Sequence, residues 1–176
     1  MNKKFMILVI AVALTVVNCS ATGKVTQVKA YAPKSTTSES IQIFLDKSAI
    51  VGSDESNMAL NLFENALMSK LKSATKHKFF TAQEKCTPAC KFKVEIVFTH
   101  INEVTDSKRA LAGAFAGRAK IEGNGKILDI KSLSSLGEFT LEELSSGGTV
   151  LAGTTKDVAK AGGDRLAQYL LLEFAD

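Results

Sequence analysis

The sequence is poor in the residues from which catalytic sites and flat binding platforms are usually built. Its 176 residues include no Trp, two Tyr and two His, while ten Phe dominate the aromatic set. This composition is typical of a compact apolar core and offers no aromatic platform for a ligand. A Ser-His-Asp triad would have to take its base from His77 or His100, and no Ser lies in a recognisable nucleophile motif. The sequence therefore predicts no catalytic residue and no enzymatic activity.

Phosphate-binding motifs are missing as well. Gly113 and Gly117 are separated by three residues and followed by Arg118, whereas a P-loop has a longer spacing and then Lys with Ser or Thr. The run Gly123-Asn124-Gly125 lacks the GxGxxG pattern of dinucleotide-binding folds. We therefore expect neither a cofactor nor a bound metal.

Neither sign of charge dominates the chain. There are 22 Lys and Arg against 18 Asp and Glu, and the two kinds are interspersed rather than gathered in blocks. Removing Lys3 and Lys4 with an N-terminal leader lowers the net charge from +4 to about +2. Nucleic-acid binding requires a basic patch or stripe. We expect no nucleic-acid partner.

The one long apolar run lies at the N-terminus and is short for a membrane-spanning helix. Lys3 and Lys4 precede the run Phe5–Val17, and a spanning helix needs about 20 apolar residues. A positive start followed by a short apolar run is typical of an export signal. We interpret residues 1–18 as a lipoprotein signal peptide.

The end of this leader resembles a bacterial lipobox, in which an aliphatic residue stands three places before a Cys that receives a diacylglycerol. Val16 fits the aliphatic position, whereas Asn18 replaces the usual small residue before Cys19. The alternative is ordinary cleavage after Ala21, which would discard Cys19. Two or more acyl chains hold a protein stably on a bilayer. Because Ser20 is not the Asp that retains lipoproteins at the inner membrane, we expect an anchor at the bacterial outer membrane, facing the periplasm or the cell surface.

Two further cysteines, Cys86 and Cys90, enclose a short segment with Pro88 at its centre. Pro favours a turn that brings the two thiols together, and exported proteins meet an oxidising compartment. A disulfide there would contribute about 2 kcal/mol by the loop-entropy relation. Two free thiols and a zinc site completed by His77 and His100 remain the alternatives.

The rest of the chain divides into a tether and one domain. Residues 19–40, rich in Ser, Thr, Lys and Ala, are interpreted as the tether, and residues 41–176 as a single domain. Hydrophobic periodicity predicts strands over 41–45, 79–81, 91–101, 120–130 and 138–144, and helices over about 54–71 and 154–173. The predicted fold is α+β, with a mostly antiparallel sheet of about four to five strands and two helices packed on one face.

Three local features refine this prediction. His100 continues the inward-facing series of the strand at 91–101. Gly123 and Gly125 lie inside a strand, where glycines indicate a bulge or a close approach of another chain segment. The pair Gly162-Gly163 weakens the last helix and indicates close contact between that helix and the sheet.

The segment 105–119 interrupts the strand pattern with small apolar residues between two arginines. We interpret it as a partner-contacting element. Its candidate contact residues are Arg109, Leu111, Phe115 and Arg118. Exposed apolar groups flanked by arginines suit a binding surface. The alternative is a hairpin whose Leu111 and Phe115 fold back onto the core.

Several segments resemble a bacterial lipoprotein family catalogued as domain of unknown function 4410. They are the run from Arg109 to Ala119, the strand end Ile127-Leu128-Asp129, the element Ser146-Gly147-Gly148 and the helix end Tyr169-Leu170. Ser134-Ser135 stands where the family has a Thr-Gly turn. The resemblance implies a fold similar to the N-terminal domain of TolB and carries no established catalytic residue.

These observations favour a non-enzymatic cell-envelope lipoprotein. Its expected partners are the membrane, through the lipid on Cys19, and an unknown envelope protein or polymer for which it is a binding or structural module. The alternative is a hydrolase or modifying enzyme acting on envelope material. That alternative requires a deep cleft that gathers His100 with a Ser and a carboxylate.

Overall fold

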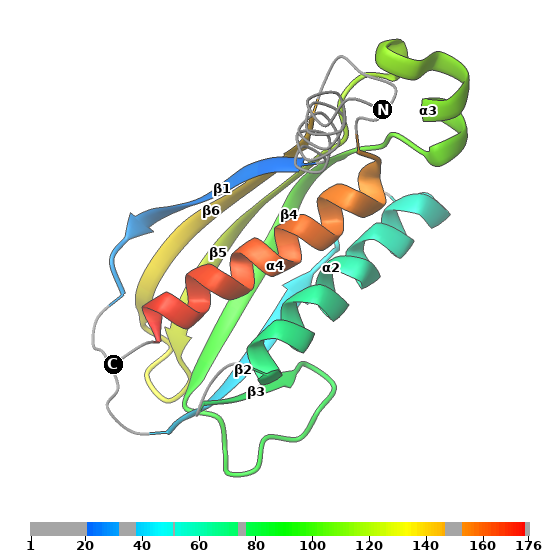
Figure 1. Ribbon diagram of the computed structural model, residues 1–176. Helices are drawn as coiled ribbons and strands as arrows, with labels where there is room; N and C mark the ends of the chain where they lie inside the picture. The colour runs from blue at the N-terminus through cyan, green and yellow to red at the C-terminus, as the bar shows by residue number, and fades with distance from the viewer. Residues whose placement is uncertain (1–20, 32–37, 51, 74–76, 147–152, 175–176) are drawn as a thin grey trace, which may run out of the picture.

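A six-stranded sheet covered on one face by two long helices forms the domain (Figure 1). The computed structural model describes residues 21–31, 38–50, 52–73, 77–146 and 153–174. The elements in chain order are β1 (Ala21–Lys29), β2 (Ser40–Asp46), α2 (Asp54–Ser73), β3 (Lys78–Thr81), β4 (Phe92–Asn102), α3 (Asp106–Ala112), the 3₁₀ turn η1 (Gly113–Ala116), β5 (Lys120–Asp129), β6 (Ser135–Ser145) and α4 (Thr155–Glu173). The predicted α+β class with two covering helices is confirmed, and α3 is an additional short helix.

The sheet is mixed, and it is larger than the sequence predicted. Its order is β1-β6-β5-β4-β2-β3. The pairs β1–β6, β6–β5 and β5–β4 are antiparallel, whereas β2 runs parallel to both β3 and β4. The parallel pairing follows from the long crossover through α2, because a helix between two strands returns the chain to the same end of the sheet.

The predicted tether over 19–40 is wrong for residues 21–29, which form the edge strand β1. Ala21 pairs with Ser145 and Lys24 with Glu142. Ala21, Gly23 and Val25 are half-buried and alternate with exposed residues, as an edge strand with one covered face requires. Tyr31 is also buried in the core. The predicted signal peptide, Cys19 and residues 32–37 lie outside the described residues.

Close contact around Gly162-Gly163 is confirmed, although the nearest element at Gly163 is α2 rather than the sheet. A Cβ atom on Gly163 would lie 2.4 Å from the Phe63 carbonyl oxygen, and one on Gly162 would lie 3.0 Å from the Phe63 ring. Gly163 therefore lets the backbones of α2 and α4 approach each other, and Gly162 leaves room for the Phe63 ring. The Phe63 ring in turn meets Phe98 of β4 edge to face, with centroids 5.1 Å apart.

The glycines of β5 mark a close approach. A Cβ atom on Gly125 would lie 2.0 Å from the ring of Phe139, which fills that space from the neighbouring strand. The β-bulge is in β4, the strand that pairs with β5, between Phe98 and His100. One extra residue there reverses the inward-outward alternation. The prediction that His100 faces inward is therefore wrong, and its side chain is exposed.

The loop between β3 and β4 contains the predicted disulfide between Cys86 and Cys90, whose Cα atoms are 5.4 Å apart. This geometry removes the free-thiol and zinc alternatives for the pair. Within the described ranges, no three His, Cys, Asp or Glu side chains gather to hold a metal ion. No helix in those same ranges has the length and apolar character needed to cross a membrane.

Candidate functional site

The α3–η1 projection, defined here as residues 105–118, extends beyond the end of the sheet between β4 and β5 (Figure 1). Thr105 caps α3, because its hydroxyl accepts a hydrogen bond from the Lys108 N–H at 3.1 Å. Gly113 ends α3 at φ 52°, and Gly117 ends η1 at φ 84°. Only glycine adopts these angles readily. The two glycines therefore reverse the chain and return it to β5.

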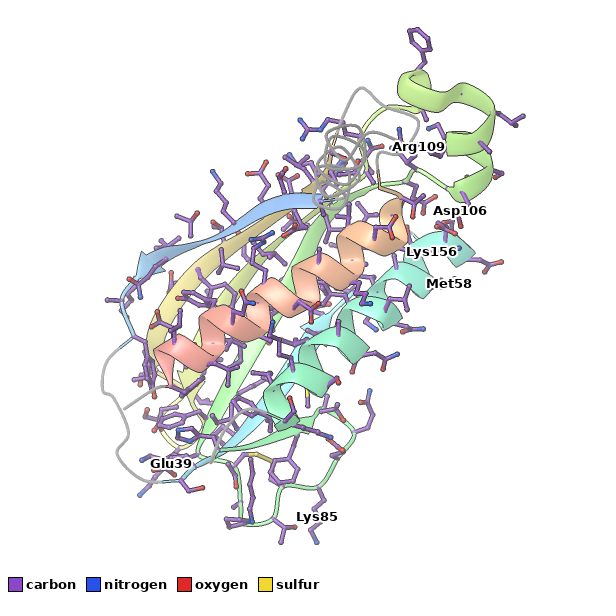
Figure 2. All side chains as sticks on the ribbon, viewed as in Figure 1. Glu39, Met58, Lys85, Asp106, Arg109 and Lys156 are labelled. Carbon is purple, nitrogen blue, oxygen red and sulfur yellow. A yellow bond between two sulfur atoms is a disulfide. The ribbon has the colours of Figure 1, made fainter. Side chains whose placement is uncertain are left out.

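The base of the projection is fixed to the start of α4. The Thr155 hydroxyl accepts from the Val104 N–H at 2.7 Å, and the Thr155 N–H donates to the Val104 carbonyl at 3.0 Å. At the surface, Lys156 Nζ lies 3.2 Å from Asp106 Oδ2 (Figure 2). It also lies 3.8 Å from Glu55 Oε2. The hydrogen bond to Asp106 and the charge of Glu55 raise the pKa of Lys156. These bonds hold the projection in one orientation relative to both helices.

Arg109 is one of these fixing residues, and its predicted role as an exposed partner contact is wrong. Its side chain is 6% exposed. Its guanidinium donates to the carbonyl oxygens of Gly113 at 3.2 Å and Gly153 at 3.0 Å. A guanidinium satisfies such carbonyls well because its donors form a rigid fork. Arg109 therefore ties the end of α3 to Gly153, two residues before the start of α4.

Arg118 lies at the other side of the base and remains exposed. Its Nε donates to the Ser145 carbonyl at 2.9 Å, and its own carbonyl accepts from Asn102 Nδ2 at 2.6 Å. The rest of its guanidinium stays at the surface. Arg118 thus connects the projection to the end of β6 while keeping its charge available.

The tip of the projection carries two large apolar side chains in solvent. Phe115 is 96% exposed and Leu111 is 90% exposed. They do not fold back onto the core, so the hairpin alternative is wrong. Covering side chains of this size is worth about 1.5–3 kcal/mol each. A rigid base that presents uncovered apolar groups is the arrangement expected of a contact surface.

A hollow of about 570 Å³ beside the projection gathers the residues that a hydrolase would need. Its lining includes Ser53, Ser56, His100, Glu103 and Lys108. Glu103 accepts hydrogen bonds from the hydroxyls of Ser53 and Ser56, and these bonds lower the pKa of Glu103. In a triad the imidazole bridges the hydroxyl and the carboxylate. Within the part of the chain that the structure describes, His100 forms no hydrogen bond with any of the three, so no such bridge exists.

A buried ion pair lies under α4 and was not predicted from the sequence. Glu143 is fully buried, and its two carboxylate oxygens accept from Arg165 Nε at 2.8 Å and from a terminal guanidinium nitrogen at 3.2 Å. The hydrogen bonds to Glu143 raise the pKa of Arg165. Gly23 leaves room for the carboxylate, since a Cβ there would lie 2.0 Å from Glu143 Oε2. The sequence signal that could have predicted it is the alternation along β6, in which Glu143 falls on the same inward face as Phe139 and Leu141.

A family profile described as Domain of unknown function (DUF4410) matches residues 27–162. The chain belongs to this family. The match includes the α3–η1 projection, the glycine-rich β5 and the first half of α4. It confirms the resemblance seen in the run from Arg109 to Ala119, and it assigns no activity. The expected similarity to TolB stays a prediction.

Solved structures share the fold of this DUF4410 chain at low sequence identity. The PelC dodecamer from Paraburkholderia phytofirmans is 12% identical, with a TM-score of 0.55, and covers 83% of this chain and 96% of that chain. A point variant of the same dodecamer is 9% identical, with a TM-score of 0.53, and covers 83% and 95%. A DUF330 protein from Xanthomonas campestris is 13% identical, with a TM-score of 0.49, and covers 84% and 92%. No curated protein matches the sequence.

Proposed function

We propose that this DUF4410 protein is a lipid-anchored component of the bacterial outer membrane that binds another envelope component without catalysing a reaction. The observation that carries the proposal is the α3–η1 projection. Its base is held by buried hydrogen bonds, whereas its tip keeps Leu111 and Phe115 in solvent. A fold gains nothing internally from such a tip. A surface that covers it gains apolar burial at little cost in ordering, because the base is already rigid.

The alternative, a hydrolase acting on envelope material, draws on the hollow that contains His100, Ser53, Ser56 and Glu103. The hydrogen bonds there favour a structural role. Ser53 caps α2, since its hydroxyl accepts from the Ser56 N–H at 3.1 Å. Both hydroxyls also donate to Glu103, which connects the start of α2 to the end of β4. These hydrogen bonds lower the pKa of Glu103, so its carboxylate is a weak base for activating either serine.

The first prediction concerns the anchor. Replacing Cys19 with Ala should move the protein from the detergent phase to the aqueous phase in detergent-phase partitioning, because the acyl chains provide the membrane affinity. Lys85→Ala, at an exposed position of the loop between β3 and β4, offers a control that leaves residues 1–19 and the projection unchanged. Equal partitioning of the wild type and Cys19→Ala would show that no lipid is attached to this residue.

The second prediction concerns the tip. The double variant Leu111→Ser/Phe115→Ser should keep the wild-type melting temperature, because neither side chain packs on the core. It should capture at least about tenfold less of the bound component, since about 1.4 kcal/mol of lost burial corresponds to a factor of ten. The measurement is crosslinking in intact cells from a photoreactive residue at the exposed position 108 of the same projection, with the wild-type tip and with the double variant.

A matched control is Met58→Ser, which changes an exposed apolar residue that lies in α2 and therefore outside the projection. Its crosslinked yield from position 108 should equal that of the wild type. A fall in melting temperature of the tip variant would show that Leu111 and Phe115 serve the fold, and an unchanged yield would remove the projection as a contact surface.

A further inference from the structure

The described chain begins at the base of the α3–η1 projection. Ala21, the first residue of β1, pairs with Ser145 at the end of β6. Ser145 in turn donates its N–H to the Ala119 carbonyl at 2.9 Å and accepts from Arg118 at 2.9 Å. Figure 1 shows β1, in blue, starting at the same end of the sheet from which α3 extends. The N-terminal end of the fold and the projection therefore share one end of the molecule.

The distance from this end to Cys19 is short. Two residues of fully extended chain span at most about 7 Å, and Cys19 precedes Ala21 by two positions. Because residues 21–29 belong to the sheet, they cannot act as a spacer. A diacylglycerol on Cys19 would therefore hold this end of the sheet directly against the bilayer, with the projection beside it.

The exposed chemistry of the projection fits a bilayer interface. Leu111 and Phe115 offer apolar groups of the kind that enter the boundary between headgroups and acyl chains. Lys108 and Arg118 are exposed cations that suit anionic headgroups. The one acidic residue of the projection, Asp106, is paired with Lys156. The projection thus presents apolar groups at its tip, and exposed positive charge nearer its base, on the side at which the lipid would be attached.

We propose that the α3–η1 projection is a second membrane contact, in which Phe115 and Leu111 insert into the interfacial layer of the same membrane that holds Cys19. The inference rests on the proposed function and deepens it, because it names the lipid surface as the component that the projection binds. A protein partner is the less favoured occupant, since the anchor places this end within about two residues of lipid. One acyl anchor and one apolar tip would fix the orientation of the domain on the membrane.

The absence of Trp from the chain provides a direct test. Phe115→Trp creates a protein with a single Trp at the tip, and the near-complete exposure of Phe115 leaves room for the larger ring. The full-length, lipid-anchored protein is reconstituted in vesicles of phosphatidylethanolamine and phosphatidylglycerol. Matching vesicles carry lipids brominated along the acyl chains, which quench a Trp in contact with them.

The matched control is Leu172→Trp, at the other end of α4. Leu172 is also exposed and lies about 25 Å along the helix from Thr155, at 1.5 Å per residue. In brominated vesicles the Trp at position 115 should lose most of its emission and be protected from aqueous iodide. The Trp at position 172 should keep its emission and remain accessible to iodide.

The outcomes separate this inference from the proposed function. Quenching at position 115 together with none at position 172 supports the membrane contact. No lipid quenching at position 115, with crosslinking from that position to an envelope protein or polymer, overturns the membrane contact and leaves the proposed function standing. If position 115 shows no quenching and no crosslinking, both the membrane contact and the proposed function are overturned. Equal quenching at positions 115 and 172 also overturns the membrane contact, because the domain would then have no fixed orientation on the membrane.

Discussion

Replacing Phe63 with Ala should lower the free energy of unfolding by about 3–5 kcal/mol. The Phe63 side chain is fully buried where α2, α4 and the sheet meet, and its ring packs edge to face on Phe98. A Cβ atom on Gly162 would lie 3.0 Å from this ring, so the ring occupies the space that Gly162 leaves open. Removing the ring would leave a cavity that no side chain of Gly162 can fill.

The measurement is urea unfolding of the wild type, Phe63→Ala and Phe63→Leu. Leu keeps most of the volume and should cost less than Ala, because volume-conserving changes are tolerated best. Phe115→Ala makes the same chemical change at an exposed position and should leave the unfolding midpoint within error of the wild type. A loss below about 1 kcal/mol in Phe63→Ala would mean that α2 and α4 can collapse around the gap.

Replacing Arg165 with Met should lower the free energy of unfolding by about 3 kcal/mol, the lower end of the range for a broken buried ion pair. The Glu143 carboxylate is fully buried beneath α4. The Arg165 side chain remains 36% exposed, so water reaches part of the pair and moderates the cost. Met keeps the apolar stem of Arg165, so the loss comes chiefly from leaving the carboxylate without its partner.

A double-variant cycle isolates this interaction. Glu143→Gln/Arg165→Met removes both charges and should recover part of the stability lost in Arg165→Met. Additive effects of the two single changes would show that the pair contributes no specific coupling.

Much of the two-layer fold could be predicted because its central elements are strongly periodic. Leu60, Phe63, Leu67 and Leu71 give α2 one buried face. Phe92, Val94 and Ile96 alternate through β4, as a half-covered strand requires. Cys86 and Cys90 were paired correctly because the Pro88 turn is local. In each case the signal lies within a few residues of the feature it predicts.

The missed features depend on distant partners. β1 has only Val25 as a large inward-facing side chain, so its sequence differs little from that of a tether until β6 is beside it. The sequence of β2 contains no local pattern that indicates parallel rather than antiparallel pairing. At the candidate site, the exposure of Leu111 and Phe115 agrees with the contact hypothesis. Arg109 is instead buried, and its guanidinium binds the carbonyl of Gly153, which lies 44 positions further along the chain.

The placement of β1 also constrains how the sheet is assembled. Among the strands that the structure describes, β1 comes first in the chain and its partner β6 comes last, so Ala21 pairs with Ser145, which lies 124 positions later. Until β6 has been synthesised, the backbone N–H and C=O groups of β1 lack the strand with which they form hydrogen bonds. A chain interrupted before residue 135 would hold an unpaired strand that could accept a strand of another molecule. Completion of the hairpin between β5 and β6 is therefore the step that gives β1 its pairing partner beside the proposed anchor.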